Sequence, residues 1–377
     1  MQVSFVDILI ATSIVQSLAL AVFLLLPGTI RLTSNQLLAA TVISFAAWLS
    51  EFFLYGTGLA LEFPNLAYLG TLVGLLQAGG LYLYARSLMY RDFRLRWEHA
   101  VHTLPFWVVS GIFLVEYYLQ PVQVKLDILS RRDHPGVLTS PLLAVAIHLV
   151  VLGYLVATIR AINRFGIDVR QIFSSTENKQ LAWLRSLLVG YAVVWTVSMV
   201  YCLAAHVLRS QAGADWVVAA GAVTGFAFIN YLLVNALRQP VLFSGLSAEE
   251  ARLLDTVDEA AGEPYADGEF LAVLEQHMRE ARPHLHSNLT VEQLARQLRV
   301  QPRELSRAIN QGLEQNFFEY VSGYRLAEAQ RLLADPANAD NILQVMYAAG
   351  FNSKSVFNTA FKKATGLTPS QYRAQHA

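Results

Sequence analysis

The sequence predicts an all-α protein in which a seven-helix transmembrane bundle is followed by a soluble helical domain. The chain of 377 residues is 54% hydrophobic and 15% charged, whereas soluble proteins carry about 25% charged residues. Nearly all of the apolar excess lies before Pro240, and the rest shows helical periodicity without the alternation of strands. We therefore expect a bundle over residues 1–240, an acidic linker over 241–269 and a helical domain over 270–377.

Seven apolar segments are long enough to cross a bilayer, which requires about 20 helical residues. They are Val6–Leu26, Gln36–Leu59, Leu66–Met89, Val101–Leu119, Pro141–Ile159, Leu184–Leu208 and Trp216–Leu237. The first segment has no basic leader and no convincing small-residue cleavage site. We expect it to be retained as a span and not removed as a signal peptide.

Basic residues predict the orientation, because loops rich in Lys and Arg stay in the cytoplasm. They concentrate in the third and fifth loops, at Arg86, Arg91, Arg94 and Arg96, and at Arg160, Arg164, Arg170, Lys179 and Arg185. With seven spans, this pattern places the N-terminus outside and the C-terminal domain in the cytoplasm.

Polar residues within the apolar segments are the candidates for sensing a ligand, because they are costly inside a membrane. The four that we single out as lining a ligand cavity are Gln77, His102, His148 and His206. The alternative for each is hydrogen bonding between helices. Glycines at Gly70 and Gly74 have the spacing that lets helices approach closely.

We expect neither a metal site nor a cofactor. Cys202 is the single cysteine, and His277, His284 and His286 fit no standard zinc spacing. The linker is strongly acidic, and its apolar residues between 246 and 257 predict a short amphipathic helix.

The C-terminal domain begins with a helix-turn-helix pattern. Thr290 is an N-cap with Gln293 as its capping-box partner, and the helix runs Val291–Leu298. A turn over residues 299–301 precedes Pro302, which suits the first turn of a second helix. That helix is expected to carry five polar residues outward, namely Arg303, Glu304, Ser306, Arg307 and Asn310.

The pattern then recurs after a spacer helix over residues 316–334. A helix from Asn341 to Tyr347, a turn around Gly350 and a helix from Ser353 to Ala364 form a second helix-turn-helix. The residues left to meet solvent or DNA are Asn352, Ser353, Lys354, Ser355, Asn358 and Lys362.

A family resemblance is carried by two runs, AAGFNSKSVF at 348–357 and FKKATGLTPSQYR at 361–373. They closely resemble the signature of the AraC/XylS family of bacterial transcription regulators, over about the last hundred residues. The resemblance implies that recognition helices 302–310 and 353–363 enter successive major grooves of DNA. Gln301 and the run Ile309-Asn310-Gln311 depart from the family pattern. The first 240 residues look like the multi-spanning membrane region of some of these regulators.

Side-chain chemistry divides the predicted contacts with double-stranded DNA into two groups. Base edges are assigned to Arg303, Arg307, Ser353, Lys354 and Asn358, and phosphates to Thr290, Lys362, Lys363 and Arg373. The sequence has 28 basic residues (Lys and Arg) and 28 acidic residues (Asp and Glu), so its formal net charge is zero. Any electrostatic attraction to DNA must therefore be local.

The leading hypothesis is a one-component sensor and not an enzyme: a multi-pass protein of the bacterial inner membrane that couples a membrane signal to transcription. Its expected partners are DNA, the lipid bilayer, an unidentified small-molecule or membrane signal, and a second copy in a homodimer. One alternative is a membrane enzyme or transporter with an attached regulator, although the first 240 residues contain no metalloprotease, nucleophile-elbow or phosphate-loop motif. Another is a membrane region that serves only as an anchor.

Overall fold

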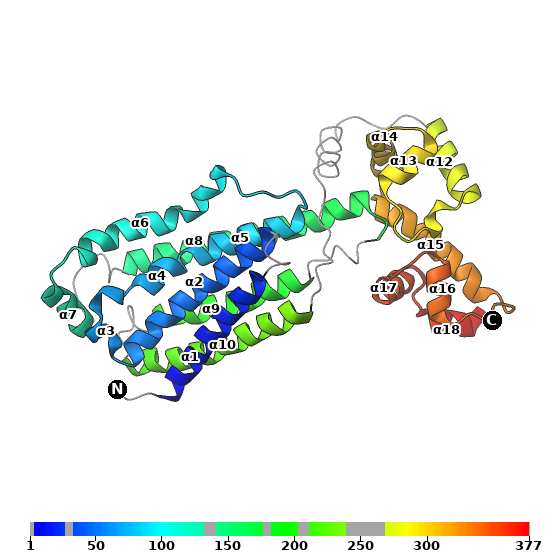
Figure 1. Cartoon of the computed structure of the whole chain (residues 1–377). Helices are drawn as coiled ribbons and strands as arrows, with labels where there is room; N and C mark the ends of the chain where they lie inside the picture. Colours follow the sequence, from blue (N-terminus) through cyan, green and yellow to red (C-terminus); the bar gives the residue numbers. More distant parts are fainter. Residues whose placement is uncertain are drawn as a thin grey trace. The chain divides into compact units, whose positions relative to one another are not determined.

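The computed structural model describes residues 4–26, 33–131, 141–175, 182–202, 211–238 and 268–376 (Figure 1). The chain divides into two compact units. Unit 1 comprises Met1–Met89, Phe93–Ile162 and Leu181–Leu242, and unit 2 comprises Tyr90–Asp92, Asn163–Gln180 and Phe243–Ala377. The elements within the described ranges are helical, with one isolated antiparallel bridge between Phe173 and Thr290. The predicted linker helix and His206 lie outside the described residues.

Unit 1 is a bundle of long helices joined by short ones. Its α-helices are α1 (Phe5–Leu24), α2 (Thr33–Gly56), α3 (Leu59–Glu62), α4 (Leu69–Gly74), α5 (Leu76–Met89), α6 (Leu104–Phe113), α7 (Val122–Arg131), α8 (Pro141–Ile172), α9 (Ala182–Cys202) and α10 (Gln211–Arg238). The shorter turns are η1 (Pro64–Leu66), η2 (Trp97–Thr103) and the π-helical η3 (Leu114–Tyr118). Within the described ranges, seven helical stretches are long and apolar enough to cross a membrane, which confirms the expected number.

Three of the seven segments differ in detail from the prediction. The third is interrupted between α4 and α5, and the fourth passes from 3-10 through α to π geometry. The fifth was expected to end at Ile159, but α8 continues to Ile172. Bilayer thickness limits the apolar length of a span and not the length of its helix. In this extension Phe165, Val169 and Ile172 are buried at helical spacing, and this end of α8 belongs to unit 2.

Within unit 1, α2 packs against α1, α4 and α5, and α10 packs against α1 and α9. Gly70 permits the close approach of α4 to α2, because a Cβ there would collide with the carbonyl oxygen of Ala47. Gln16 and Asn230 join α1 to α10 through their side-chain amides, 3.2 Å from Asn230 Nδ2 to Gln16 Oε1. These two polar side chains are thus paired between helices.

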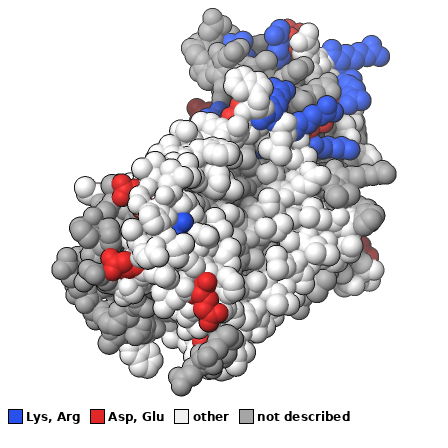
Figure 2. All heavy atoms as spheres, turned by 60° about the vertical axis from the view of Figure 1, so that its left-hand side comes forward, with Lys and Arg blue, Asp and Glu red and all other residues white. Residues whose placement is uncertain are grey.

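The exterior of unit 1 is apolar. Trp97, Leu142 and Trp216 are 87%, 81% and 78% exposed, and uncharged residues make up most of the face of the bundle that Figure 2 shows. Such a surface would be unusual in water, where exposed apolar patches mark a binding or membrane surface.

Unit 2 contains the C-terminal helices α12 (Gly268–Glu280), α13 (Val291–Leu298), α14 (Pro302–Arg307), α15 (Phe317–Ala334), α16 (Ile342–Ala348), α17 (Lys354–Thr365) and α18 (Pro369–His376), with η7 (Pro283–Leu285) and the π-helical η8 (Ala308–Gly312). The central helix α15 contacts η8, which precedes it in the sequence, and α16, α17 and α18, which follow it. It is the predicted spacer. Leu333, Met346, Phe357 and Phe361 are among the fully buried residues that join it to the second helix pair.

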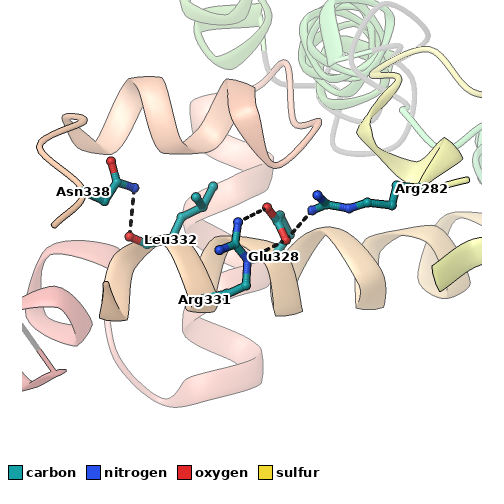
Figure 3. Close-up of polar contacts among 5 residues, drawn as sticks. All are labelled: Arg282, Glu328, Arg331, Leu332 and Asn338. Atoms are coloured by element: carbon teal, nitrogen blue, oxygen red, sulfur yellow. Dashed lines mark hydrogen bonds and ion pairs between the residues drawn. The ribbon is translucent and has the colours of Figure 1, made fainter. Parts of the chain in front are cut away.

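Charged and polar contacts fix α15 near its C-terminal end (Figure 3). The Glu328 carboxylate accepts a 2.8 Å hydrogen bond from Arg331 Nη2 and lies 2.6 Å from Arg282 Nη2. The hydrogen bond from Arg331, followed by that from Arg282, lowers the pKa of Glu328 to about 2. Asn338 Nδ2 donates to the carbonyl of Leu332 at 3.0 Å, satisfying a carbonyl that the helix end leaves open.

Gly350, which ends α16, requires glycine for two reasons. Its φ is +86°, a conformation that L side chains rarely adopt. A Cβ would also collide with the carbonyl oxygen of His284 and lie 3.0 Å from Leu285 Cα. The turn of the second helix pair therefore packs directly on the backbone that leads to the first.

We predict that Gly350→Ala destabilises unit 2 by at least about 2 kcal/mol, because the positive φ alone costs about 1–2 kcal/mol and the backbone clash adds to it. Hydrogen exchange of α15 and α17 amides in the detergent-solubilised chain would measure the loss. Gly323→Ala is the matched control: Gly323 lies inside α15 with no atom within 4 Å of an added Cβ. It should stabilise α15 by about 0.5–1 kcal/mol. Equal effects of the two substitutions would contradict the role of Gly350.

Candidate nucleic-acid interface

The first helix-turn-helix consists of α13, a tight turn and α14. Thr290 Oγ1 accepts from the Gln293 amide at 3.2 Å, and Gln293 Oε1 accepts from the Thr290 amide at 3.1 Å, so the predicted capping box is confirmed. Arg299 ends α13 with φ +57°, and Pro302 begins α14. This left-handed residue lets the chain turn sharply into the second helix.

The first helix-turn-helix exposes fewer of its predicted contact residues than expected. Arg303 and Glu304 are exposed, while Arg307 and Asn310 are half-buried. The Glu304 carboxylate accepts a 3.3 Å hydrogen bond from the backbone amide of Gln301. It therefore caps the N-terminus of its own helix, where Gln301 replaces the more usual serine.

The outward position of Ser306 was predicted wrongly. Ser306 is 6% exposed, and its Oγ lies 3.4 Å from Asn310 Nδ2. The helix becomes π-helical at residues 308–312, and this change of pitch breaks the simple 3.6-residue pattern from which its faces were assigned.

The second helix-turn-helix consists of α16, the turn at Gly350 and α17. Asn341 caps α16, with its Oδ1 2.9 Å from the Gln344 amide. Ser353 caps α17, with its Oγ 3.3 Å from the Val356 amide. Ser353 is only 4% exposed, so its expected position facing solvent or DNA was wrong: the hydroxyl is used by the helix end, and neighbouring elements cover it.

The exposed face of α17 carries most of the remaining predicted contacts. Lys354, Ser355, Lys362 and Lys363 are exposed and Asn358 is half-buried. Residues 354, 358 and 362 repeat at four-residue spacing and share one face of the helix. They line a surface concavity of about 690 Å³, together with Lys363 and with Thr368 and Ser370 beside the start of α18. This arrangement offers ammonium and amide donors, which suit phosphate oxygens and base edges.

Arg325 of the spacer is buried beneath both helix pairs, at 2% exposure. Its Nε donates to the carbonyl of His284 at 2.8 Å, and its Nη2 donates to those of His286 and Ser287 at 2.8 and 3.1 Å. The guanidinium also lies 5.9 Å from the ring of Phe351. It thereby links α15 to the loop before α13 and to the turn before α17.

The contact of Arg325 extends to a segment far away in sequence. Its Nη1 donates to the carbonyl of Ser174 at 2.6 Å and its Nη2 to Ser174 Oγ at 2.9 Å. Ser174 follows α8 and belongs to the same compact unit. Sequence reasoning missed this contact. Arg325 shares a four-residue spacing with the buried Val321 and Ala329, a signal that could have indicated a buried arginine.

Burial also affects His284. It is 5% exposed and its ring lies 5.6 Å from that of Tyr324. Desolvation, reinforced by the nearby Arg282, lowers the pKa of His284 to about 4. The imidazole therefore stays neutral in the folded protein where an unfolded chain would protonate it at about 6.5.

We predict that unit 2 loses stability as the pH falls from about 6.5 to about 4. In this range His284 is protonated in the unfolded chain and stays neutral in the folded protein, so protonation favours unfolding. His284→Leu should reduce this dependence. Calorimetric unfolding of the solubilised chain across this range would measure it. His286→Leu is the control, since His286 is exposed in the same loop and only its carbonyl is needed by Arg325. An unchanged pH profile in His284→Leu would refute the assignment.

The candidate ligand residues of unit 1 have separate partners. Gln77 Nε2 donates to the carbonyl of Ser44 at 3.3 Å, His102 Nδ1 lies 3.0 Å from Tyr154 Oη, and His148 Nδ1 lies 2.7 Å from the carbonyl oxygen of Ala144. Gln77 lines a cavity of about 20 Å³ whose lining includes neither histidine. That volume holds roughly one water molecule.

In the described part of the chain, no group of three or more His, Cys, Asp or Glu residues is placed to hold a metal ion. Pairing with a neighbouring helix is the role that the geometry gives to Gln77 and His102.

Comparison with known proteins assigns the C-terminal region. Residues 294–375 match the family model described as a helix-turn-helix domain. The chain is 31% identical over 96 residues to the uncharacterized HTH-type transcriptional regulator YdeC of Bacillus subtilis, which covers 25% of this chain and 32% of YdeC. No solved structure matches the chain.

Two further relatives have more specific names. The transcriptional activator RhrA of Rhizobium meliloti is 30% identical over 96 residues, covering 26% of this chain and 30% of RhrA. The HTH-type transcriptional regulator CdhR of Pseudomonas aeruginosa is 33% identical over 101 residues, covering 27% of this chain and 30% of CdhR. The chain thus spans about a third of the length of these relatives, and the similarity concerns only its C-terminal part.

Proposed function

Since residues 294–375 form a helix-turn-helix domain of the AraC type, we propose that the chain is a membrane-anchored transcription regulator that binds specific DNA sequences. The observation that carries this proposal is the exposed face of α17, where Lys354, Asn358 and Lys362 line one concavity. A helix of 12 residues with such a face has the size and the donors to read a major groove.

Contacts are assigned from side-chain chemistry. Arg303 and Arg307 of α14, and Lys354 and Asn358 of α17, would read base edges. Thr290, Lys362, Lys363 and Arg373 would bind phosphates, and their neutralisation of phosphate charge would make affinity fall with salt. Ser306 and Ser353 are buried and would act by shaping the two recognition helices.

The apolar surface and the seven long apolar helices of unit 1 support insertion in the bacterial inner membrane. The contact between Ser174 and Arg325 supports the orientation. It requires the loop after the fifth span to lie on the same side of the membrane as the C-terminal helices. The excess of Arg and Lys in the third and fifth loops favours the cytoplasm, where DNA is, for that side, and would leave the N-terminus outside.

The membrane region would couple a signal to DNA binding, as in a one-component sensor. A signal can act only by binding two states of the protein with different affinity. Relatives of the C-terminal region are named as transcription regulators, which favours regulation over a membrane enzyme or transporter. A homodimer would allow two such domains to bind repeated DNA sites.

We predict that the purified chain in lipid nanodiscs enriches a DNA motif from a random duplex library, at a stated salt concentration. Lys354→Ala with Asn358→Ala should abolish this enrichment, because each base-reading pair contributes about 1–3 kcal/mol of discrimination.

Its matched control is Gln276→Ala with Arg279→Ala, a pair at three-residue spacing on the exposed face of α12, which should enrich the same motif as the wild type. A library that remains random with folded wild-type chain would mean that the proposed sequence-specific binding does not occur.

We predict that removing residues 1–240 abolishes the response of transcription to growth conditions while DNA binding persists. A chromosomal reporter would compare the full chain, the truncated chain and a fusion of residues 241–377 to an unrelated membrane protein. If the chain is a sensor, only the full chain should change reporter transcription with growth conditions. If the unrelated fusion responds equally well, the membrane region is merely an anchor.

A further inference from the structure

Residues Phe173, Ser174 and Ser175, which directly follow α8, are bound to the C-terminal helices by several hydrogen bonds. We call them the docking segment. Ser174 donates to the carbonyl of Leu289 from its amide at 3.1 Å and from its Oγ at 2.7 Å. Ser174 is 1% exposed, so it is enclosed like a residue of the domain that it contacts.

The receptor for this segment is built around Arg325. Besides the loop carbonyls, the guanidinium binds both the carbonyl and the hydroxyl of Ser174. Arginine cannot lose its charge in a protein at neutral pH, and each buried donor needs an acceptor. Ser174 supplies two acceptors, and the site accordingly fits this polar, small residue.

The docking segment also touches one predicted DNA contact in each helix-turn-helix. Phe173 forms the antiparallel bridge with Thr290, the N-cap of α13. Ser175 Oγ donates to Asn352 Oδ1 at 2.9 Å, next to the N-cap of α17. The segment therefore lies near the N-termini of α13 and α17, where each helix-turn-helix would approach phosphates and bases.

We propose that the docking segment is an intramolecular ligand of the double helix-turn-helix and competes with DNA for it. The proposal rests on the proposed function and adds its regulation. Docking holds Asn352 and Thr290 and lowers DNA affinity, and DNA binding expels the segment, because such coupling is reciprocal. Expulsion is feasible since the contacts are largely polar and water can replace them.

A disulfide tests docking directly. In full-length Cys202→Ser chain in nanodiscs, Phe173→Cys with Thr290→Cys places two thiols at an antiparallel bridge. Its Cα separation of about 4.5–5.5 Å suits a disulfide. Mild oxidation should form the internal disulfide, and a random-sequence duplex pool should slow its formation. Phe173→Cys alone is the control that cannot close the bond. Failure of the pair to cross-link in folded chain would overturn docking, whatever the DNA result.

The same variant tests competition. Fluorescence anisotropy with the duplex pool should show affinity about tenfold higher after reduction than in the oxidised form, within the usual range of coupling. Both forms carry identical substitutions, so the loss of Thr290 cancels. Equal or lower affinity after reduction would overturn competition while leaving docking intact. No DNA binding in wild type or either form would instead refute the proposed function.

A milder variant covers the case in which the cysteine pair fails to fold. Ser175→Ala removes the hydrogen bond to Asn352 and should raise DNA affinity about threefold, the value of one net hydrogen bond. Ser130→Ala, an exposed serine bonded to the carbonyl of Asp127, should leave affinity unchanged. An unchanged or lower affinity in Ser175→Ala would count against competition.

Discussion

The burial of the Arg325 guanidinium is the constraint around which the C-terminal unit is organised. Burial lowers its pKa to about 10, so it remains charged at neutral pH, and an unpaired buried charge would cost several kcal/mol. Its hydrogen bonds go to four backbone carbonyls and one hydroxyl. The loop at 284–287 must turn its carbonyls inward to meet this need. That fixes the entry to α13 and presses the same loop against Gly350 before α17.

Local sequence predicted where the C-terminal helices begin, because the contacts that cap their N-termini join residues three apart. The Thr290 box with Gln293 and the caps at Asn341 and Ser353 depend on little else. The faces of the helices were less predictable. Ser306 and Ser353 are buried, and the π-helical turn after α14 shifts the pattern. The receptor at Arg325 was missed because arginine is normally assigned to the surface, although its spacing placed it on the buried face.

The number of apolar spans was predictable since bilayer thickness sets one length for all of them. Their internal irregularities were not. The break between α4 and α5 and the π-helical turn at η3 depend on packing with neighbouring helices. Among the described residues, the candidate ligand residues Gln77, His102 and His148 lie apart for a related reason. A polar side chain within an apolar segment needs a hydrogen-bond partner. Gln77 and His102 have theirs on adjacent helices.

Under the proposed function, the continuity of α8 provides a route by which an event in the membrane would reach the C-terminal helices. One residue separates Ile172, the last residue of α8, from Ser174, so the docking segment has almost no slack. Hydrogen bonds weaken steeply when donor and acceptor move beyond about 3.2 Å, and those of Ser174 measure 2.6–3.1 Å. A displacement smaller than the rise of one residue, about 1.5 Å, would therefore suffice to undock it. Each bond contributes only about 0.5–1.5 kcal/mol net. In the proposed competition with DNA, their combined contribution would be large enough to change DNA affinity and small enough for a ligand to reverse.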